Sequence, residues 1–178
     1  MAHLALTGAL LVGGASRRFG SPKALAELDG ETLATRGRRV LGEACDEVLV
    51  IGKPGELPFE VLDDGTEVRA PIAGVAAGLR AARHDVCVFL PVDCPWVTAA
   101  TLRRLGEACR DAAVPQTGPL PGAWAKSALP VLEARLAAGG PLALHRAYDE
   151  LDVVTVQVDP AELADADTPG ELVARRDD

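Results

Sequence analysis

The feature that most restricts the fold of this chain is a pair of strongly apolar runs, at residues 4–12 and 86–92. The first run ends at the glycine pair Gly13-Gly14, and the second ends at Asp93. Strands that helices cover on both faces have continuous apolar sequences of this kind. The two runs therefore predict buried strands, each followed by a loop in which polar chemistry can be placed.

Helical and strand patterns alternate along the rest of the chain. Apolar residues fall on one helical face after Thr32, and a short strand pattern follows at 48–51. Pro71 and Thr98 each suit the start of a further helix. Weaker patterns predict strands at 59–62 and 153–158 and helices at 129–136, at 142–148 and from 168 onward. This order predicts one Rossmann-like α/β domain over residues 1–178, with a mostly parallel open sheet and helices on both faces.

Charge and cysteine content narrow the class of protein. The net charge of −8 opposes non-specific attraction to nucleic acid or to an anionic membrane, so neither is expected as a partner. The N-terminal apolar run is much shorter than the roughly 20 residues of a membrane span and lacks the flanks of a signal peptide. Four cysteines without a C-x-x-C pair indicate reduced thiols, and we expect a cytoplasmic protein.

The loop that follows the first apolar run carries the strongest chemical signal. Gly13 and Gly14 let a ligand approach the backbone and can turn N–H groups toward phosphate oxygens, while Arg18 and Lys23 can neutralise a triphosphate. The alternative is an ordinary glycine turn with solvated basic side chains. Neither G-x-x-x-x-G-K-[ST] nor G-x-G-x-x-G occurs, which disfavours a P-loop enzyme and a dinucleotide-binding oxidoreductase.

Acidic residues follow two of the predicted strands. Asp93 ends the second apolar run, where a carboxylate at the carboxyl edge of the sheet can hold Mg²⁺ against phosphate oxygens. Its alternative role is that of a plain turn residue before Pro95. Asp63 and Asp64 follow a weaker strand pattern, and paired acids before Gly65 are also common in turns.

Four ordered segments resemble the molybdenum cofactor guanylyltransferases and their nucleotidyltransferase relatives. Residues 11–23 match L-x-G-G-x-S-x-R-x-G-x-x-K, and residues 71–74 with 77–79 are similar to the family's GPLAG helix start. Residues 91–95 resemble its P-C-D-x-P metal segment, and residues 165–172 its N-x-N-T-P-x-D-L segment. The resemblance extends over nearly the whole chain and implies the fold of the nucleotide-diphospho-sugar transferases.

The resemblance also implies roles for individual residues. Backbone contacts to the nucleotide are expected at Leu11, Val12 and Gly13, phosphate binding at Lys23, and both Mg²⁺ and nucleotide binding at Asp93. A further family aspartate corresponds to Asp64, with Asp63 as its rival. The complete expected nucleotide-binding set is Leu11, Val12, Gly13, Gly14, Ser16, Lys23, Asp64 and Asp93, and the expected catalytic set is Arg18, Lys23 and Asp93.

Five positions depart from the family pattern. Phe19 replaces methionine, Ala70 replaces glycine, and Leu120 stands where a histidine precedes proline. Asp165 and Asp167 replace the two asparagines of the family's terminal segment. Because of Leu120, Asp165 and Asp167, the resemblance does not define the acceptor side of the site.

The implied activity is transfer of GMP from GTP to the terminal phosphate of molybdopterin, with Mg²⁺ as cofactor and transient contact with a molybdoenzyme or a cofactor-delivery protein. The alternatives are a molybdopterin cytidylyltransferase, a phospholactate guanylyltransferase, a sugar-phosphate nucleotidyltransferase and a non-catalytic nucleotide-binding carrier. The carrier alternative predicts a broken phosphate or metal site, whereas Gly13, Lys23 and Asp93 are all present.

Overall fold

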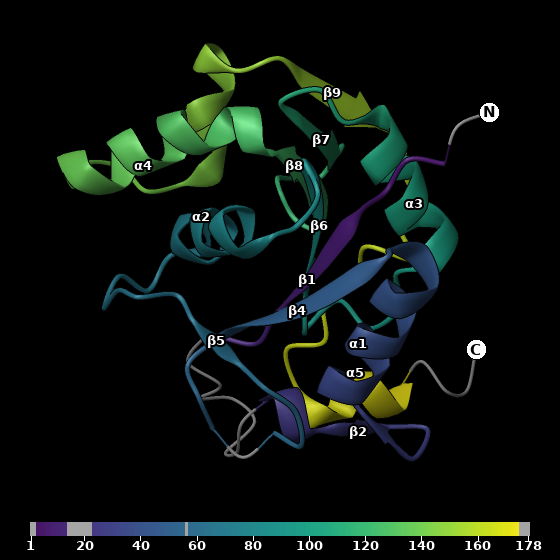
Figure 1. Ribbon diagram of the computed structural model, residues 1–178. Coiled ribbons are helices and arrows are strands. Elements are labelled where there is room, and N and C mark those ends of the chain that lie inside the picture. The colour runs from purple at the N-terminus through teal and green to yellow at the C-terminus, as the bar shows by residue number, and fades with distance from the viewer. Residues whose placement is uncertain (1–2, 14–22, 56, 175–178) are drawn as a thin grey trace.

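The computed structural model describes residues 3–13, 23–55 and 57–174, with side chains to residue 172 (Figure 1). Seven strands of the described chain form one sheet in the order β5-β4-β1-β6-β8-β7-β9. Their bounds are β1 Thr7–Leu11, β4 Glu47–Gly52, β5 Leu62–Asp63, β6 Val86–Pro91, β7 Ala112–Pro115, β8 Gly122–Ala125 and β9 Val153–Val156. A separate antiparallel pair joins β2, Glu27–Leu28, to β3, Glu31–Thr32.

The sheet is parallel except at one strand among those described. β1 pairs in parallel with both β4 and β6, and β4 pairs in parallel with β5. β8 runs antiparallel to both of its neighbours, β6 and β7, and β9 is again parallel to β7. The predicted mostly parallel open sheet is thus confirmed, with a reversal that the sequence did not reveal.

Helices cover both faces of this sheet, as expected (Figure 1). α1, Leu33–Ala44, and α3, Ala99–Ala108, pack together on one face, and α2, Pro71–Ala81, and α4, Leu129–Ala138, on the other. A short helix α5, Pro169–Ala174, lies near η1, Lys23–Leu25, in Figure 1. Two further 3-10 segments are η2, Lys126–Ala128, and η3, Leu144–Glu150. No helix in the described part of the chain is long and apolar enough to cross a bilayer.

The helix starts that the sequence predicted at Pro71 and Thr98 are confirmed, and Thr32 is a cap that the sequence did not single out. Thr32 caps α1, because its hydroxyl accepts the Thr35 N–H at 3.1 Å, and Thr98 caps α3 by accepting the Thr101 N–H at 3.2 Å. Pro71 opens α2, where the missing N–H costs nothing. Thr32 and Thr98 therefore fix where α1 and α3 begin on the same face of the sheet.

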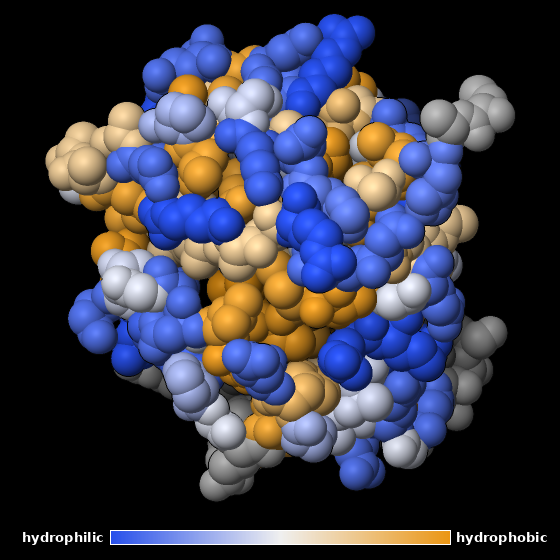
Figure 2. Space-filling model, in the orientation of Figure 1, coloured by the Kyte–Doolittle hydropathy of each residue, from blue (hydrophilic) through white to orange (hydrophobic). Residues whose placement is uncertain are grey.

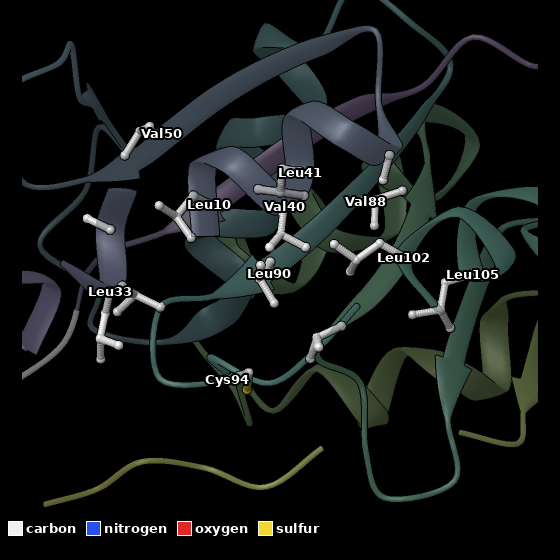
Figure 3. Close-up of a cluster of buried hydrophobic side chains, with 14 of the residues drawn as sticks. Leu10, Leu33, Val40, Leu41, Val50, Val88, Leu90, Cys94, Leu102 and Leu105 are labelled. Atoms are coloured by element: carbon white, nitrogen blue, oxygen red, sulfur yellow. The ribbon is translucent and has the colours of Figure 1, made fainter. Parts of the chain in front are cut away.

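Small residues allow the helices to lie close against the strands. A Cβ on Gly37 of α1 would lie 2.5 Å from Leu10 Cδ1, and a Cβ on Gly78 of α2 would lie 2.4 Å from Phe89 Cε1. Figure 3 shows the cluster of buried apolar side chains beneath α1 and α3, which includes Leu90 and Cys94. Close packing of this kind holds the ends of β1 and β6 in place.

Several boundaries differ from the sequence-based expectations. The strand predicted at 59–62 is reduced to Leu62–Asp63, and the helix predicted at 142–148 is the 3-10 segment Leu144–Glu150. β9 ends at Val156, two residues early. The reversal into β8 is made by a Pro- and Gly-rich turn so tight that a Cβ on Gly122 would lie 2.4 Å from the Pro119 carbonyl oxygen.

Because β5 is so short, it covers only part of the edge of β4. The pairing is limited to Ile51 with Leu62 and Gly52 with Asp63. Apolar residues gather over this part of the sheet, below α2, as Figure 2 shows. The carboxyl end of β4 is the end that β5 covers, and this is also the edge at which the polar loops lie.

Candidate functional site

The candidate site lies where the chain crosses from one side of β1 to the other. β4 and β6 flank β1, and Leu11 pairs with Pro91 at the carboxyl ends of β1 and β6. Ligands of open α/β sheets bind at such a switch point. The structure therefore places Gly13 and Asp93 beyond the ends of neighbouring parallel strands, on one edge of the sheet as the sequence predicted.

Backbone hydrogen bonds hold these strand ends together. The Val12 N–H donates to the Ile51 carbonyl at 2.9 Å, and the Val92 N–H donates to the Leu11 carbonyl at 3.0 Å. These bonds use the backbone groups of Leu11 and Val12 that face the neighbouring strands. Gly13 is exposed beyond them, so its backbone is the first of the loop to face a ligand.

Gly52 allows this loop to pass close to β4. A Cβ on Gly52 would lie 2.8 Å from Val12 Cγ2 and 3.0 Å from the Gly13 nitrogen. A contact with a backbone atom at that distance requires the loop to move. The position of the Gly13 N–H thus depends on glycine at the end of the neighbouring strand.

We expect Gly52→Ala to displace the Gly13 loop. Overpacking of this kind costs about 1 to 3 kcal/mol, so the melting temperature should fall and nucleotide affinity should drop several-fold. Calorimetric unfolding and a nucleotide titration would measure the two effects. Gly42→Ala is the matched control, because a Cβ there meets nothing within 4 Å and alanine favours the helix. Equal behaviour of the two variants would contradict the proposed packing role of Gly52.

Lys23 is drawn into the site by carboxylates from two other segments. Its ammonium lies 3.1 Å from Asp167 Oδ1 and 3.7 Å from Asp93 Oδ2. The side chain is only 15% exposed, although it belongs to a one-turn 3-10 segment at the edge of the molecule. The structure therefore brings together two residues that the sequence had singled out, Lys23 and Asp93, and adds Asp167.

The segment before α5 is fixed by its own caps. The Ala166 N–H donates to the Asp93 carbonyl at 2.8 Å, which ties the segment to the end of β6. The Glu171 carboxylate accepts from the N–H groups of Asp167 and Thr168, and Thr168 Oγ1 accepts in turn from the Glu171 N–H. This reciprocal capping box holds Asp167 beside Lys23.

Asp165 completes a group that can hold a metal ion. Oxygen atoms of Asp93 and Asp165 and the sulfur of Cys94 lie within 4.8 Å of one another. The Cys94 thiol donates to Asp165 Oδ1 at 3.4 Å, and burial raises the pKa of this thiol far above its usual range. Cys94 therefore stays protonated as a donor, which leaves the two carboxylates as the hard oxygen ligands that Mg²⁺ prefers.

Negative charge is crowded at this point. Partial burial raises the pKa of Asp165, and the carboxylates of Asp93 and Asp167 raise it further. The thiol of Cys94 and the charge of Lys23 act in the opposite direction. A site with these properties favours a bound cation.

Asp63 and Asp64 occupy a second position, at the carboxyl end of β5 and two strands away from β1. Lys53, which follows β4, lies 3.0 Å from Asp63 Oδ1 and 2.9 Å from Asp64 Oδ1. Its ammonium also donates to the Thr66 carbonyl at 2.7 Å. The Gly65 N–H and Lys53 lower the pKa of Asp63, while Asp64 and Asp63 raise the pKa of Lys53. Both acids stay candidates, since either carboxylate is held by Lys53.

Three residues of the expected site, Gly14, Ser16 and Arg18, lie outside the described residues, so their predicted roles stay predictions. Asp165 and Asp167 belong to the site as well, although the sequence does not single them out as site residues. The sequence shows the 165–172 segment only as a helix start with two altered motif residues. The sequence does not reveal the hydrogen bond that brings Ala166 to the end of β6.

A shallow hollow of about 340 Å³ opens beside the carboxyl end of β7. This is the same edge of the sheet, two strands from β6 and on the side away from β4. Its lining has no Asp, Glu, Lys or Arg and consists of Val114, Pro115, Gln116, Thr117, Gly118, Pro119, His145, Tyr148 and Thr155.

Comparison with known proteins gives one family and a consistent set of relatives. Residues 8–153 match the family model described as MobA-like NTP transferase domain. A probable molybdenum cofactor guanylyltransferase of Deinococcus radiodurans is 38% identical over 147 residues, which cover 76% of each chain. A molybdenum cofactor guanylyltransferase of Desulfosudis oleivorans is 28% identical over 92% of this chain and 86% of its own. A probable enzyme of the same name from Opitutus terrae is 43% identical, but only 56% of its length is matched.

Solved structures share the fold at lower identity. Molybdopterin-guanine dinucleotide biosynthesis protein A from Archaeoglobus fulgidus superposes with a TM-score of 0.79 at 24% identity, covering 96% of this chain and 97% of that one. The 2-C-methyl-D-erythritol 4-phosphate cytidylyltransferase from Thermus thermophilus gives 0.73 at 21%, covering 93% and 95%. At these identities the likeness establishes the fold of nucleotidyltransferases.

Proposed function

Since this chain belongs to the MobA-like NTP transferase family, it is a nucleotidyltransferase, and we propose that it transfers GMP from GTP to the terminal phosphate of the molybdopterin cofactor. The relatives named molybdenum cofactor guanylyltransferase support this choice of substrates. The observation that carries the proposal is the convergence of Lys23, Asp93 and Asp165 at the switch point beside Gly13.

We further propose that Asp93 and Asp165 hold Mg²⁺. The donor set fits this ion, because two carboxylates offer hard oxygen ligands at the end of β6 and the neighbouring thiol is kept protonated. When bound, the ion neutralises phosphate oxygens and orients them for transfer. Lys23 then contributes a further positive charge from the adjacent side.

The residues present suit an in-line displacement. An oxygen of the acceptor phosphate attacks the α-phosphorus of GTP, the new P–O bond forms, and the bond to the β-phosphate breaks to release pyrophosphate. A phosphate monoester is largely a dianion at neutral pH, because its second pKa is about 6, so no general base is required. Lys23 binds and orients the phosphates. Its positive charge also offsets the negative charge that develops on the departing pyrophosphate. Arg18 is proposed for the same task.

The position of the strands suggests how the substrates are divided between the two sides of β6. The Gly13 loop and the acids near Lys53 lie on the β1, β4 and β5 side. The hollow beside β7 lies on the other side of β6 at the same edge. Nucleotide on the first side and acceptor on the second would place the reacting phosphates at Asp93.

Base selectivity is the sharpest test of this function. With Mg²⁺ present, GTP should bind at least about tenfold more tightly than ATP, CTP or UTP, because one or two base-specific hydrogen bonds supply that difference. Titration of the protein with each of the four triphosphates measures it. A preference for CTP would contradict the proposal and favour the molybdopterin cytidylyltransferase alternative.

A catalytic assay separates the remaining alternatives. Pyrophosphate release from GTP should require molybdopterin, whereas release with phospholactate or a sugar phosphate alone would identify a different acceptor. Binding of GTP without release of pyrophosphate would favour the non-catalytic carrier.

The cellular setting is also a proposal. All four cysteines are free thiols, Cys87 and Cys94 buried and Cys45 and Cys109 partly buried, as expected for a cytoplasmic protein. The product would pass from the cytoplasmic enzyme to a molybdoenzyme or a delivery protein by transient contact.

A further inference from the structure

Of the two described carboxylates that pair with Lys23, that of Asp167 lies closer to its ammonium. Its Oδ1 atom lies 3.1 Å from the Lys23 ammonium, whereas Asp93 Oδ2 lies at 3.7 Å. The capping box of α5 fixes the backbone of Asp167, so its carboxylate is presented from a rigid support. The carboxylate brings a full negative charge to this contact, which an amide side chain in its place would lack.

The described side chains at this point carry more negative than positive charge. Three carboxylates, from Asp93, Asp165 and Asp167, surround one ammonium from Lys23. Each ionised carboxylate repels a polyphosphate that carries no counter-ion, and a divalent cation offsets this repulsion.

We propose that Asp167 is a positioning residue that holds Lys23 toward Asp93 and makes nucleotide binding depend on magnesium. This inference rests on the proposed function, because it assumes that Lys23 and Asp93 face the phosphates. Asp167 acts through Lys23 and through its own charge, and it need not touch the substrate.

The charge of Asp167 affects free and metal-bound nucleotide differently. A free triphosphate is about twice as negative as its complex with one Mg²⁺, so the carboxylate repels the free form more strongly. It also attracts the ion that accompanies the bound form. Removal of the charge should therefore strengthen binding of free nucleotide and leave binding of the magnesium complex nearly unchanged.

Asp167→Asn isolates this effect, because the amide oxygen can still accept the hydrogen bond from Lys23. The probe is GTP carrying a fluorescent N-methylanthraniloyl label, titrated once with excess EDTA and once with saturating Mg²⁺. Without metal, the variant should bind about tenfold more tightly than the parent, the effect of one nearby charge at the protein surface. With metal, the two proteins should differ by less than about threefold.

Glu133→Gln is the matched control. It removes one negative charge and releases one cation, Arg80, from an exposed ion pair of 2.7 Å between α4 and the last turn of α2. Since α2 starts at the carboxyl edge and Arg80 lies at its other end, this pair is remote from Lys23. Glu133→Gln should bind the labelled nucleotide as the parent does under both conditions.

The outcomes separate this inference from the proposed function. A gain of affinity cannot result from damage to the fold, so tighter metal-free binding by Asp167→Asn supports the inference. Unchanged metal-free binding, or a gain matched by Glu133→Gln, overturns it while the function stands. Weaker binding by Asp167→Asn under both conditions also overturns it, with thermal unfolding as the check on folding. A parent that binds no labelled GTP at all would instead contradict the proposed function.

Discussion

Asp93→Asn is expected to slow turnover by a factor on the order of 10² or more, the usual effect of removing one electrostatic stabiliser. Asparagine keeps the size of the side chain and can still form the hydrogen bonds of a turn, but it loses the anionic oxygen that a hard cation prefers. The hydrogen bond from the Ala166 N–H to the Asp93 carbonyl joins two backbone groups, so the substitution does not affect it. The fold should therefore survive while the chemistry fails.

The measurement is pyrophosphate release with molybdopterin and GTP at saturating Mg²⁺, together with thermal unfolding of both proteins. Asp159→Asn is the control, because Asp159 is an exposed turn aspartate whose Oδ1 accepts the Ala161 N–H at 2.9 Å. A proline follows it directly, much as Pro95 follows Asp93 in its own turn. If Asp93→Asn were as active as Asp159→Asn, Asp93 would be only a turn residue.

Lys23→Ala is expected to raise the KM for GTP by about 10- to 100-fold, because a hydrogen bond to a charged group contributes about 1.5 to 3 kcal/mol. Turnover should fall as well, since the phosphates lose their orientation. The effect is large because Lys23 is the cation that contacts both Asp93 and Asp167. Its removal leaves these carboxylates facing the triphosphate directly.

Steady-state kinetics with GTP as the varied substrate measures this change. Lys126→Ala is the comparison variant, because Lys126 also belongs to a one-turn 3-10 segment, at the opposite edge of the sheet beside Asp85. Unchanged kinetics in Lys23→Ala would mean that Lys23 is an ordinary surface charge and that the phosphates bind elsewhere.

The central part of the fold could be predicted because its signals are local. The apolar runs that became β1 and β6 are long enough to specify buried strands, and Thr32 and Thr98 cap helices within three residues of themselves. Pro71 likewise marks the start of α2. Each of these features depends on neighbours in the sequence, which one chain is sufficient to show.

The reversal at β8 could not be predicted, because strand direction is set by pairing partners. β8 consists of Gly122, Ala123, Trp124 and Ala125, which have no strong strand pattern. Its register is decided by distant residues, such as Val88 on β6 and Ala113 on β7. Nothing within the four residues indicates an antiparallel neighbour on both sides.

The site could be predicted only in part, because some of its residues reach it through contacts with distant segments of the chain. Gly13, Lys23 and Asp93 follow strands or end a motif, so their position at the carboxyl edge follows from the order of elements. Asp165 and Asp167 reach the site through the Ala166 bond and the capping box, which the sequence shows only as a helix start. The sequence thus showed the altered residues but not their meeting with Lys23.

The pairing of Lys23 with Asp167 also has a consequence for how the molecule is made. The two residues are 144 positions apart, so their contact closes a very large loop of chain. During synthesis, β1, β4 and β6 can associate long before residue 167 has left the ribosome. A nascent chain can therefore hold the centre of the sheet in its native arrangement while Lys23 still lacks this partner. Competence for nucleotide transfer would be acquired late, as a separate event from the folding of the scaffold.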